Sequence, residues 1–149
     1  IFRIEIMSKS FKYFHLSNEK VYYNFFEKIK LTKQKKSLIF LYGEMGSGKT
    51  SLVTSFVKHL DKKAIATSPT FTLINEYNID NFKIFHYDLF RLDSPQELLE
   101  IGIDYYFSQE GMHFIEWPEK FLNLLPMSNY DIFFTILENS RLIKVVKNC

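Results

Sequence analysis

The sequence predicts an α/β fold in which helices flank a mostly parallel central sheet and a C-terminal hairpin closes the chain. Two observations lead to this prediction: short apolar runs alternate with segments of helical periodicity, and a glycine-rich loop joins one such run to the next helix. The 149 residues contain no Gly/Ser-rich or Pro-rich linker and no internal repeat, so we expect residues 1–149 to form a single domain. Met7 is a candidate natural start, which would leave residues 1–6 upstream of it.

Composition and charge exclude several classes of protein. The hydrophobic fraction is 46% and the charged fraction 24%, which is ordinary for a globular chain and unlike a disordered one. Lys and Arg number 19 against 17 Asp and Glu, and a net charge of +2 is too small for a strongly electrostatic nucleic-acid binder. No apolar run reaches the roughly 18 residues that a membrane span needs. The single cysteine, Cys149, allows no internal disulfide, which suits a cytoplasmic protein.

The first half of the chain predicts a helix, a strand and a second helix. Residues 18–30 carry apolar side chains at helical spacing, and Ser17 or Asn18 can cap this helix. A basic stretch at residues 33–36 predicts a solvated loop rather than a contact with RNA. Residues 37–42 form a continuous apolar run, which favours a strand covered on both faces. Residues 49–60 again place their apolar side chains on one face and predict a helix.

The second half predicts mainly strands. Five short apolar runs are expected to form them, at residues 72–77, 83–87, 112–115, 130–137 and 141–146. The turn-like pair Asp80-Asn81 separates the first two, and Asn139-Ser140 separates the last two, which form the closing hairpin. Between them, Ser94 is expected to cap a short helix that has Pro95 at its first position and that Gly102 ends.

The glycine-rich loop between the first strand and the second helix matches the phosphate-binding pattern G-x-x-x-x-G-K-[ST] at every position. It consists of Gly43, Glu44, Met45, Gly46, Ser47, Gly48, Lys49 and Thr50. The glycines let backbone N–H groups converge on an anion, and the start of the helix adds its dipole. Lys49 would supply charge for β- and γ-phosphates, Thr50 a hard oxygen for Mg²⁺, and Ser51 can reach an α-phosphate. The sequence therefore predicts a P-loop NTPase-type fold that binds a nucleoside triphosphate with Mg²⁺.

Two acidic residues follow apolar strands and are candidates for the chemistry. Asp88 follows residues 84–87, and Glu116 follows Phe114-Ile115. Because the carboxyl ends of parallel strands collect at one edge of a sheet, both should lie near the P-loop. Either carboxylate could hold Mg²⁺, and the other could orient or activate the attacking water. The spacing alone leaves the two assignments open.

For other polar residues, the sequence permits both a structural and a functional interpretation. Thr70, in the stiff turn Ser68-Pro69-Thr70, could be a switch hydroxyl that senses the γ-phosphate and the metal, or simply a turn residue. Trp117 follows Glu116 and could belong to the core or to the site. His86 is expected to be a packed strand histidine rather than a base, and the histidines of the chain show no zinc-ligand spacing.

Together these segments resemble the TsaE family (older name YjeE), the P-loop ATPase of bacterial tRNA threonylcarbamoyladenosine synthesis. The resemblance runs from about residue 16 to the C-terminus and rests on four blocks in the family's order, at residues 41–50, 68–73, 86–91 and 115–119. The first block occurs in many ATPases, whereas the S-P-T-F, H-Y-D-L-F-R and E-W-P-E segments are specific. Phe90 stands where tyrosine is usual, and Met45 and Ser47 replace the common Leu and Ala. The match to the family is weaker around Arg141, so the resemblance assigns no role to that residue or its neighbours.

The resemblance implies a weak, partner-regulated ATPase whose cofactors are ATP and Mg²⁺. The residues it assigns are Lys49 and Thr50 for phosphate and Mg²⁺, Glu116 for the metal, Asp88 for hydrolysis, Thr70 for a switch-like loop and Trp117 for the surroundings of the nucleotide. It implies TsaB and TsaD as partners, with TsaD transferring the threonylcarbamoyl group to tRNA. Contact of this chain with tRNA would be indirect or weak, and the oligomeric state stays open.

A small-molecule kinase of the P-loop type is the alternative function. Such kinases usually clamp the transferring phosphoryl group with several lid arginines. This chain has only Arg3, Arg91 and Arg141, and they do not cluster in one segment. A GTPase would need a guanine-reading N-K-x-D segment, which the sequence lacks. The ATPase is therefore the function that we expect.

Overall fold

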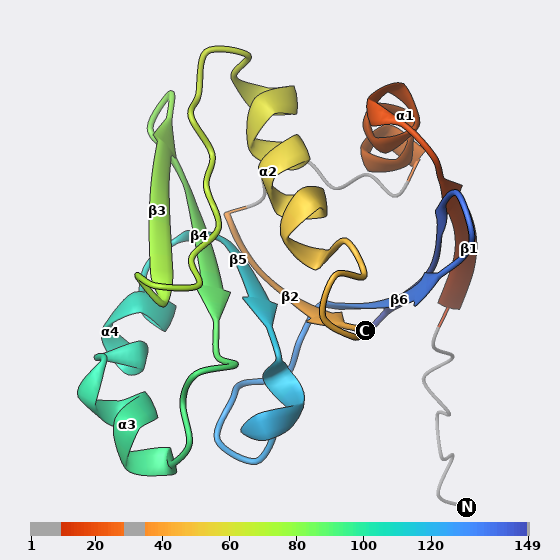
Figure 1. Ribbon diagram of the computed structural model, residues 1–149. Helices are drawn as coiled ribbons and strands as arrows, with labels where there is room; N and C mark the ends of the chain where they lie inside the picture. Colours follow the sequence, from red (N-terminus) through yellow and green to blue (C-terminus); the bar gives the residue numbers. More distant parts are fainter. Residues whose placement is uncertain (1–9, 29–34, 149) are drawn as a thin grey trace, which may run out of the picture.

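The computed structural model describes residues 10–28 and 35–148 (Figure 1). In these ranges the strands are β1 (Ser10–Leu16), β2 (Lys36–Tyr42), β3 (Ile74–Ile79), β4 (Phe82–Asp88), β5 (Gly111–Glu116), β6 (Tyr130–Ile136) and β7 (Arg141–Lys147). The helices are α1 (Glu19–Lys28), α2 (Lys49–Leu60), α3 (Pro95–Glu100), α4 (Ile103–Phe107) and the 3₁₀ turn η1 (Pro118–Lys120). The candidate start at Met7, residues 33–34 of the basic stretch and Cys149 lie outside the described residues.

One seven-stranded sheet, in the order β1-β7-β6-β2-β5-β4-β3, organises the described chain. Its four central strands are parallel: β2 pairs with β5 and β6, and β5 pairs with β4. Both edges are antiparallel, with β3 on β4 at one side and the β6–β7 hairpin carrying β1 at the other. The predicted α/β fold with a mostly parallel centre and a C-terminal hairpin is confirmed. The parallel centre brings the carboxyl ends of β2, β4 and β5 to one edge.

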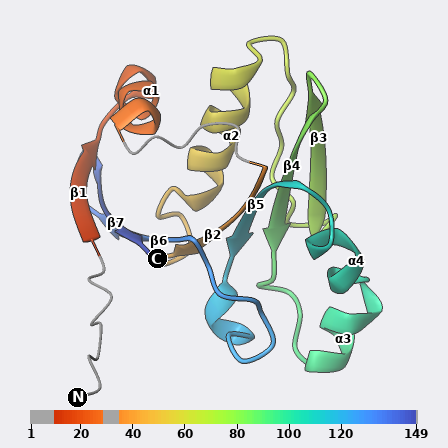
Figure 2. The same cartoon turned by 180° about the vertical axis from the view of Figure 1, so that it is seen from behind.

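Helices cover both faces of the sheet, so the sheet separates two apolar cores (Figures 1 and 2). Strand β2 contributes side chains to both cores, because successive side chains of a strand point to opposite faces of the sheet. Ile39 and Leu41 pack in the core under α1 and α2, whereas Leu38 and Phe40 pack in the core under α3 and α4. This double coverage explains the continuous apolar run that the sequence shows over β2.

Strand β1 was not predicted from the sequence. It pairs antiparallel with β7 along its whole length, from Ser10 opposite Lys147 to Leu16 opposite Arg141. This pairing joins segments that lie more than a hundred residues apart, so no local sequence pattern predicts it. Its consequence for function is local, because it places Leu16 and the residue after it beside the glycine-rich loop.

One predicted boundary moves for an identifiable reason, and one helix was not predicted. Strand β3 begins at Ile74 rather than at residue 72, because Leu73 has a left-handed backbone (φ 66°) and its N–H donates to Pro69 O at 2.7 Å. Gly102 does end the predicted short helix, but its left-handed conformation (φ 75°) also starts α4, which the sequence analysis did not foresee. Ser94 caps α3 as predicted, accepting from the Glu97 N–H at 3.2 Å.

None of the helices in the described ranges is long and apolar enough to cross a membrane.

Candidate functional site

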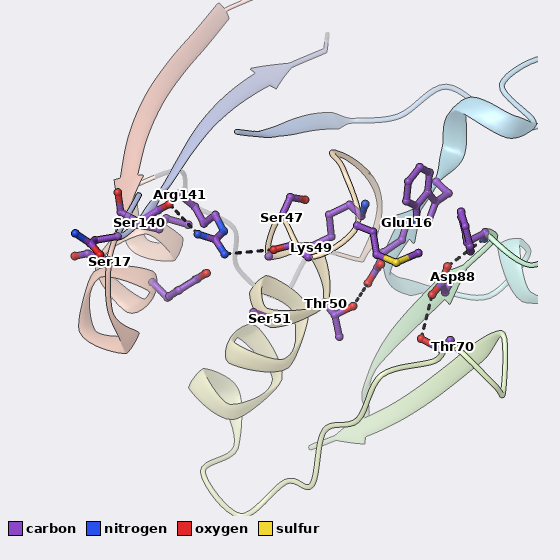
Figure 3. A pocket seen from close by; sticks show the side chains of 18 residues that line it. Ser17, Ser47, Lys49, Thr50, Ser51, Thr70, Asp88, Glu116, Ser140 and Arg141 are labelled. Carbon is purple, nitrogen blue, oxygen red and sulfur yellow. Dashed lines mark hydrogen bonds between the residues drawn. The ribbon is translucent and has the colours of Figure 1, made fainter. Parts of the chain in front are cut away.

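A cavity of about 460 Å³ opens at the carboxyl edge of the parallel strands (Figure 3). One side of it, here called the acidic end, is formed by Lys49, Thr50, Thr70, Asp88, Glu116 and Trp117. The opposite side, here called the hairpin end, is formed by Leu16, Ser17, Tyr22, Asn139, Ser140 and Arg141. The glycine-rich loop runs between the two ends and contributes Met45, Gly46, Ser47, Gly48 and Ser51, and Phe90 completes the lining. Most residues predicted for the site therefore share one cavity.

The glycine-rich loop connects β2 to α2 as the sequence predicted. Gly46 and Gly48 have left-handed backbones (φ 78° and 106°), which a side chain would strain, and Gly48 is the N-cap of α2. The first backbone bond of the helix runs from Leu52 N to Gly48 O at 3.0 Å, so the N–H groups of the preceding residues have no partner within the helix. A helix start of this kind that faces a cavity is a binding site for an anion such as phosphate.

Lys49 brings a buried positive charge to the acidic end. Its Nζ donates to the carbonyls of Gly43 and Glu44, the latter at 3.2 Å, and lies 3.9 Å from the centre of the Trp117 ring. Burial lowers the pKa of Lys49, and the nearby carboxylates of Glu116, Glu119 and Asp88 oppose this shift. Gly43 and Glu44, predicted to bind the nucleotide, are not among the residues that line the cavity, and their carbonyls accept from Lys49 Nζ.

Glu116 is bonded to the first turn of α2. Thr50 Oγ1 donates to Glu116 Oε1 at 2.6 Å, and His86 Nε2 lies 2.7 Å from the same oxygen. His86 is buried in β4, as predicted, but its partner is this carboxylate rather than the apolar core. Thr50 and Glu116 thus present two hard oxygen ligands side by side in the cavity, a donor set that suits Mg²⁺.

Asp88 lies next to Glu116, because the two residues are direct partners in the β4–β5 ladder. Its Oδ2 accepts from Thr70 Oγ1 at 3.4 Å, and its Oδ1 accepts from the Phe90 N–H at 3.1 Å. Burial raises the pKa of Asp88, and Glu116 adds to this, while the Phe90 N–H, His86 and Thr70 act in the opposite direction. The geometry thus pairs Glu116 with Thr50 and Asp88 with Thr70.

Thr70 is held in place by its own segment as well as by Asp88. Ser68 Oγ and Thr70 Oγ1 are 2.7 Å apart, and Arg91 Nη1 donates to the Thr70 carbonyl at 3.2 Å. The same guanidinium lies 5.6 Å from the centre of the exposed Phe71 ring. Thr70 is therefore a turn residue that also lines the cavity, and its role as a switch hydroxyl stays a prediction.

The hairpin end was missed by the sequence analysis. Arg141 reaches from the start of β7 to the glycine-rich loop, donating from Nη2 to Gly46 O at 3.3 Å and from Nη1 to Ser140 O at 2.9 Å. Tyr22 was predicted only as part of an apolar helix face, and Ser17 and Ser140 only as cap and turn residues. No local signal marks these residues, because they meet only when β1, α1 and the β6–β7 hairpin pack together.

Comparisons with known proteins agree on one family. Residues 16–143 match the family model described as "Threonylcarbamoyl adenosine biosynthesis protein TsaE". The tRNA threonylcarbamoyladenosine biosynthesis protein TsaE of Haemophilus influenzae is 35% identical over 118 residues, which cover 79% of this chain and 75% of that protein. The TsaE protein of Rickettsia typhi is 32% identical over 133 residues, which cover 89% of this chain and 92% of that protein. The crystal structure of YdiB from Bacillus subtilis superposes with a TM-score of 0.73 at 22% identity, covering 94% of this chain and 87% of that one, and shows the same fold.

Proposed function

The chain belongs to the TsaE family, and on that premise we propose that it is a Mg²⁺-dependent ATP-binding protein and weak ATPase. Its ATPase would support threonylcarbamoyladenosine modification of tRNA in the cytoplasm, through a complex of TsaB and TsaD. The names of its relatives state a part in this biosynthesis. The observation that carries the proposal is the cavity in which a glycine-rich loop and a helix start face one lysine and two buried carboxylates.

The triphosphate would occupy the acidic end. The open N–H groups at the start of α2 and the dipole of that helix favour an anion there. Lys49, which in this structure donates to two neutral backbone carbonyls, would exchange them for anionic phosphate oxygens, and a bond in which donor and acceptor are both charged is the stronger one. The nucleoside would then extend along the glycine-rich loop toward the hairpin end, where Leu16 and Tyr22 offer apolar surface and Ser17 and Arg141 polar groups.

Thr50 and Glu116 would hold the Mg²⁺ ion. Their oxygens lie 2.6 Å apart and both face the cavity. Within the described residues there is no cluster of three His, Cys, Asp or Glu side chains that could hold a metal, so the phosphates and water would complete the ligand set. Bound there, Mg²⁺ would neutralise charge on the phosphates.

Asp88 would orient the water that attacks the γ-phosphate. Its carboxylate lies in the cavity beside Glu116, and the hydroxyl of Thr70 donates to one of its oxygens. The two arginines near the cavity support a low rate for the protein alone. Arg91 is not among the residues that line the cavity, and Arg141 lines its hairpin end, so neither guanidinium lines the acidic end, where it would stabilise charge on a transferring phosphoryl group.

Exposed apolar side chains in and near the cavity support a protein partner. Met45 is 68% exposed, Phe71 86% and Phe90 42%, and Met45 and Phe90 line the cavity itself. Apolar groups gathered around a polar cavity are typical of a surface that another protein covers. A partner bound there would contact the glycine-rich loop and the segments that hold Thr70 and Asp88, and could therefore change the rate of hydrolysis.

The test is ATP hydrolysis with Mg²⁺, measured with and without the TsaB–TsaD pair and tRNA, with GTP as the control nucleotide. We expect slow ATP turnover that changes when the pair and tRNA are added. Lys49→Ala should abolish it, which would exclude a contaminating ATPase. Turnover that ignores the pair, with phosphate passing instead to a small acceptor, would overturn the proposal in favour of a P-loop kinase.

A further inference from the structure

The carboxylate of Glu116 is held by two donors on a single oxygen. Thr50 Oγ1 lies 2.6 Å and His86 Nε2 2.7 Å from Oε1, whereas no donor in the described part of the chain reaches Oε2. A carboxylate that binds a metal is ionised and has only lone pairs to offer, so the imidazole must donate its Nε2–H. The arrangement fixes one oxygen and leaves the other open to a ligand.

His86 is an unusual choice for this position if only packing matters. Its side chain is fully buried, and its Nδ1 has no hydrogen-bond partner among the described residues. A buried polar atom without a partner costs free energy, which an apolar side chain in β4 would avoid. Within residues 10–28 and 35–148, the imidazole makes one hydrogen bond, the one to Glu116.

We propose that His86 is the positioning residue of the metal-side carboxylate: its Nε2–H locks Glu116 beside Thr50, so that the two present their oxygens to a divalent cation together. The inference rests on the proposed function, because it gives a role to a residue behind the metal ligands. Groups that hold a metal ligand from behind in this way commonly contribute about tenfold to hundredfold to metal affinity.

His113 provides a matched control. It is equally buried and lies on β5, the neighbouring strand. Its Nδ1 accepts from Tyr87 Oη at 2.7 Å, and its Nε2 donates to Gln109 O at 3.0 Å, so it touches neither Glu116 nor Thr50. Loss of a buried histidine should affect stability at either position, but only His86 should affect the cation.

The experiment measures Mn²⁺ binding by electron paramagnetic resonance, with a non-hydrolysable ATP analogue bound. The His86→Leu variant should bind Mn²⁺ about tenfold or more weakly than wild type. With the metal removed by EDTA, the affinity of this variant for the analogue should stay within about twofold of wild type. His113→Leu should lower the melting temperature and leave Mn²⁺ binding unchanged. His86→Gln should restore most of the binding, since its amide can reach Glu116, whereas His86→Asn is too short and should not.

Two results would overturn the inference: wild-type Mn²⁺ affinity in a folded His86→Leu variant, or an equal loss in His113→Leu. If His86→Leu fails to fold, the Gln and Asn variants decide, and equal Mn²⁺ affinities in that pair would refute the role of the Nε2–H. Failure of the proposed function looks different, because the wild-type protein would then bind neither the analogue nor Mn²⁺ with it.

Discussion

The two ends of the cavity are built in different ways. At the acidic end, polar and charged side chains on the central parallel strands and on α2 are bonded to one another, as Thr50 is to Glu116 (Figure 3). At the hairpin end, side chains come from the antiparallel edge and from α1, and Arg141 donates to two backbone carbonyls. Substitutions at the acidic end should therefore change chemistry and phosphate binding strongly, and those at the hairpin end should change nucleoside binding modestly.

The largest effect is expected for Asp88→Asn. Asn cannot accept a proton or hold the attacking water in the same way, so hydrolysis should fall about 10² to 10⁴-fold. ATP affinity should stay close to that of wild type, because Asp88 is bonded to Thr70 and Phe90 N–H rather than to the glycine-rich loop. Single-turnover hydrolysis and calorimetric titration with ATP measure the two quantities. Hydrolysis at the wild-type rate would remove Asp88 from the chemistry.

Lys49→Ala should have the next largest effect, on binding. A hydrogen bond to a charged group contributes about 1.5 to 3 kcal/mol, so ATP affinity should fall about tenfold to a hundredfold. AMP lacks the β- and γ-phosphates that Lys49 is expected to contact, and its affinity should change little. Equal losses for ATP and AMP in parallel titrations would show that Lys49 supports the loop as a whole rather than the outer phosphates.

At the hairpin end, Arg141→Ala should weaken the binding of all adenine nucleotides alike, unlike Lys49→Ala. Of the bonds that Arg141 donates to the Gly46 and Ser140 carbonyls, only the one to Gly46 holds the glycine-rich loop, and losing such a bond costs on the order of 1 kcal/mol, so we expect affinity to fall about threefold to tenfold. The loss should be the same for ATP, ADP and AMP, because Arg141 lies at the end away from Lys49 and Glu116. A loss that grows with the number of phosphates would place Arg141 at the triphosphate and break the distinction between the two ends.

The contrast also explains what the sequence could reveal. Lys49 and Thr50 stand in one unbroken motif, and Asp88 and Glu116 each follow an apolar strand, so the general geometry of parallel sheets was enough to bring them together. No sequence motif identifies Tyr22 as a cavity residue, because its position on α1 follows the apolar spacing of the core residues. Arg141 reaches the glycine-rich loop because β7 pairs with β6 and β6 pairs with β2, which brings together segments far apart in the sequence.

His86 lies between these two cases. Its place on a buried strand was predicted, but its bond to Glu116 was not, because spacing cannot show which face of β4 meets which side chain of β5. The sheet register resolves this: Asp88 is opposite Glu116, and His86, two residues earlier on the same face, is opposite Phe114. A carboxylate side chain leaning back along its strand can then reach the imidazole.

The smallest effect concerns the core beneath the acidic end, in which His113 is the buried histidine remote from the cavity. Burial lowers the pKa of His113 to about 4, an effect that Lys36 strengthens and the bond to the Gln109 carbonyl opposes. The unfolded chain takes up this proton near pH 6.5, so the folded state is fully favoured above that pH and loses stability as the pH falls from about 6.5 toward 4. Between pH 7.5 and 6.0 the loss should be about 1 kcal/mol.

For a chain of this length, that loss lowers the melting temperature by about 2 to 4 °C. Melting curves of the wild type and of His113→Gln at both pH values measure it, and subtracting the two removes the contribution of every other titrating group. His113→Gln should be less stable at pH 7.5 but show a smaller drop at pH 6.0. Equal drops in the two proteins would mean that His113 can be protonated in the folded state, and that the hydrogen bond that Tyr87 donates to its Nδ1 does not hold the ring neutral.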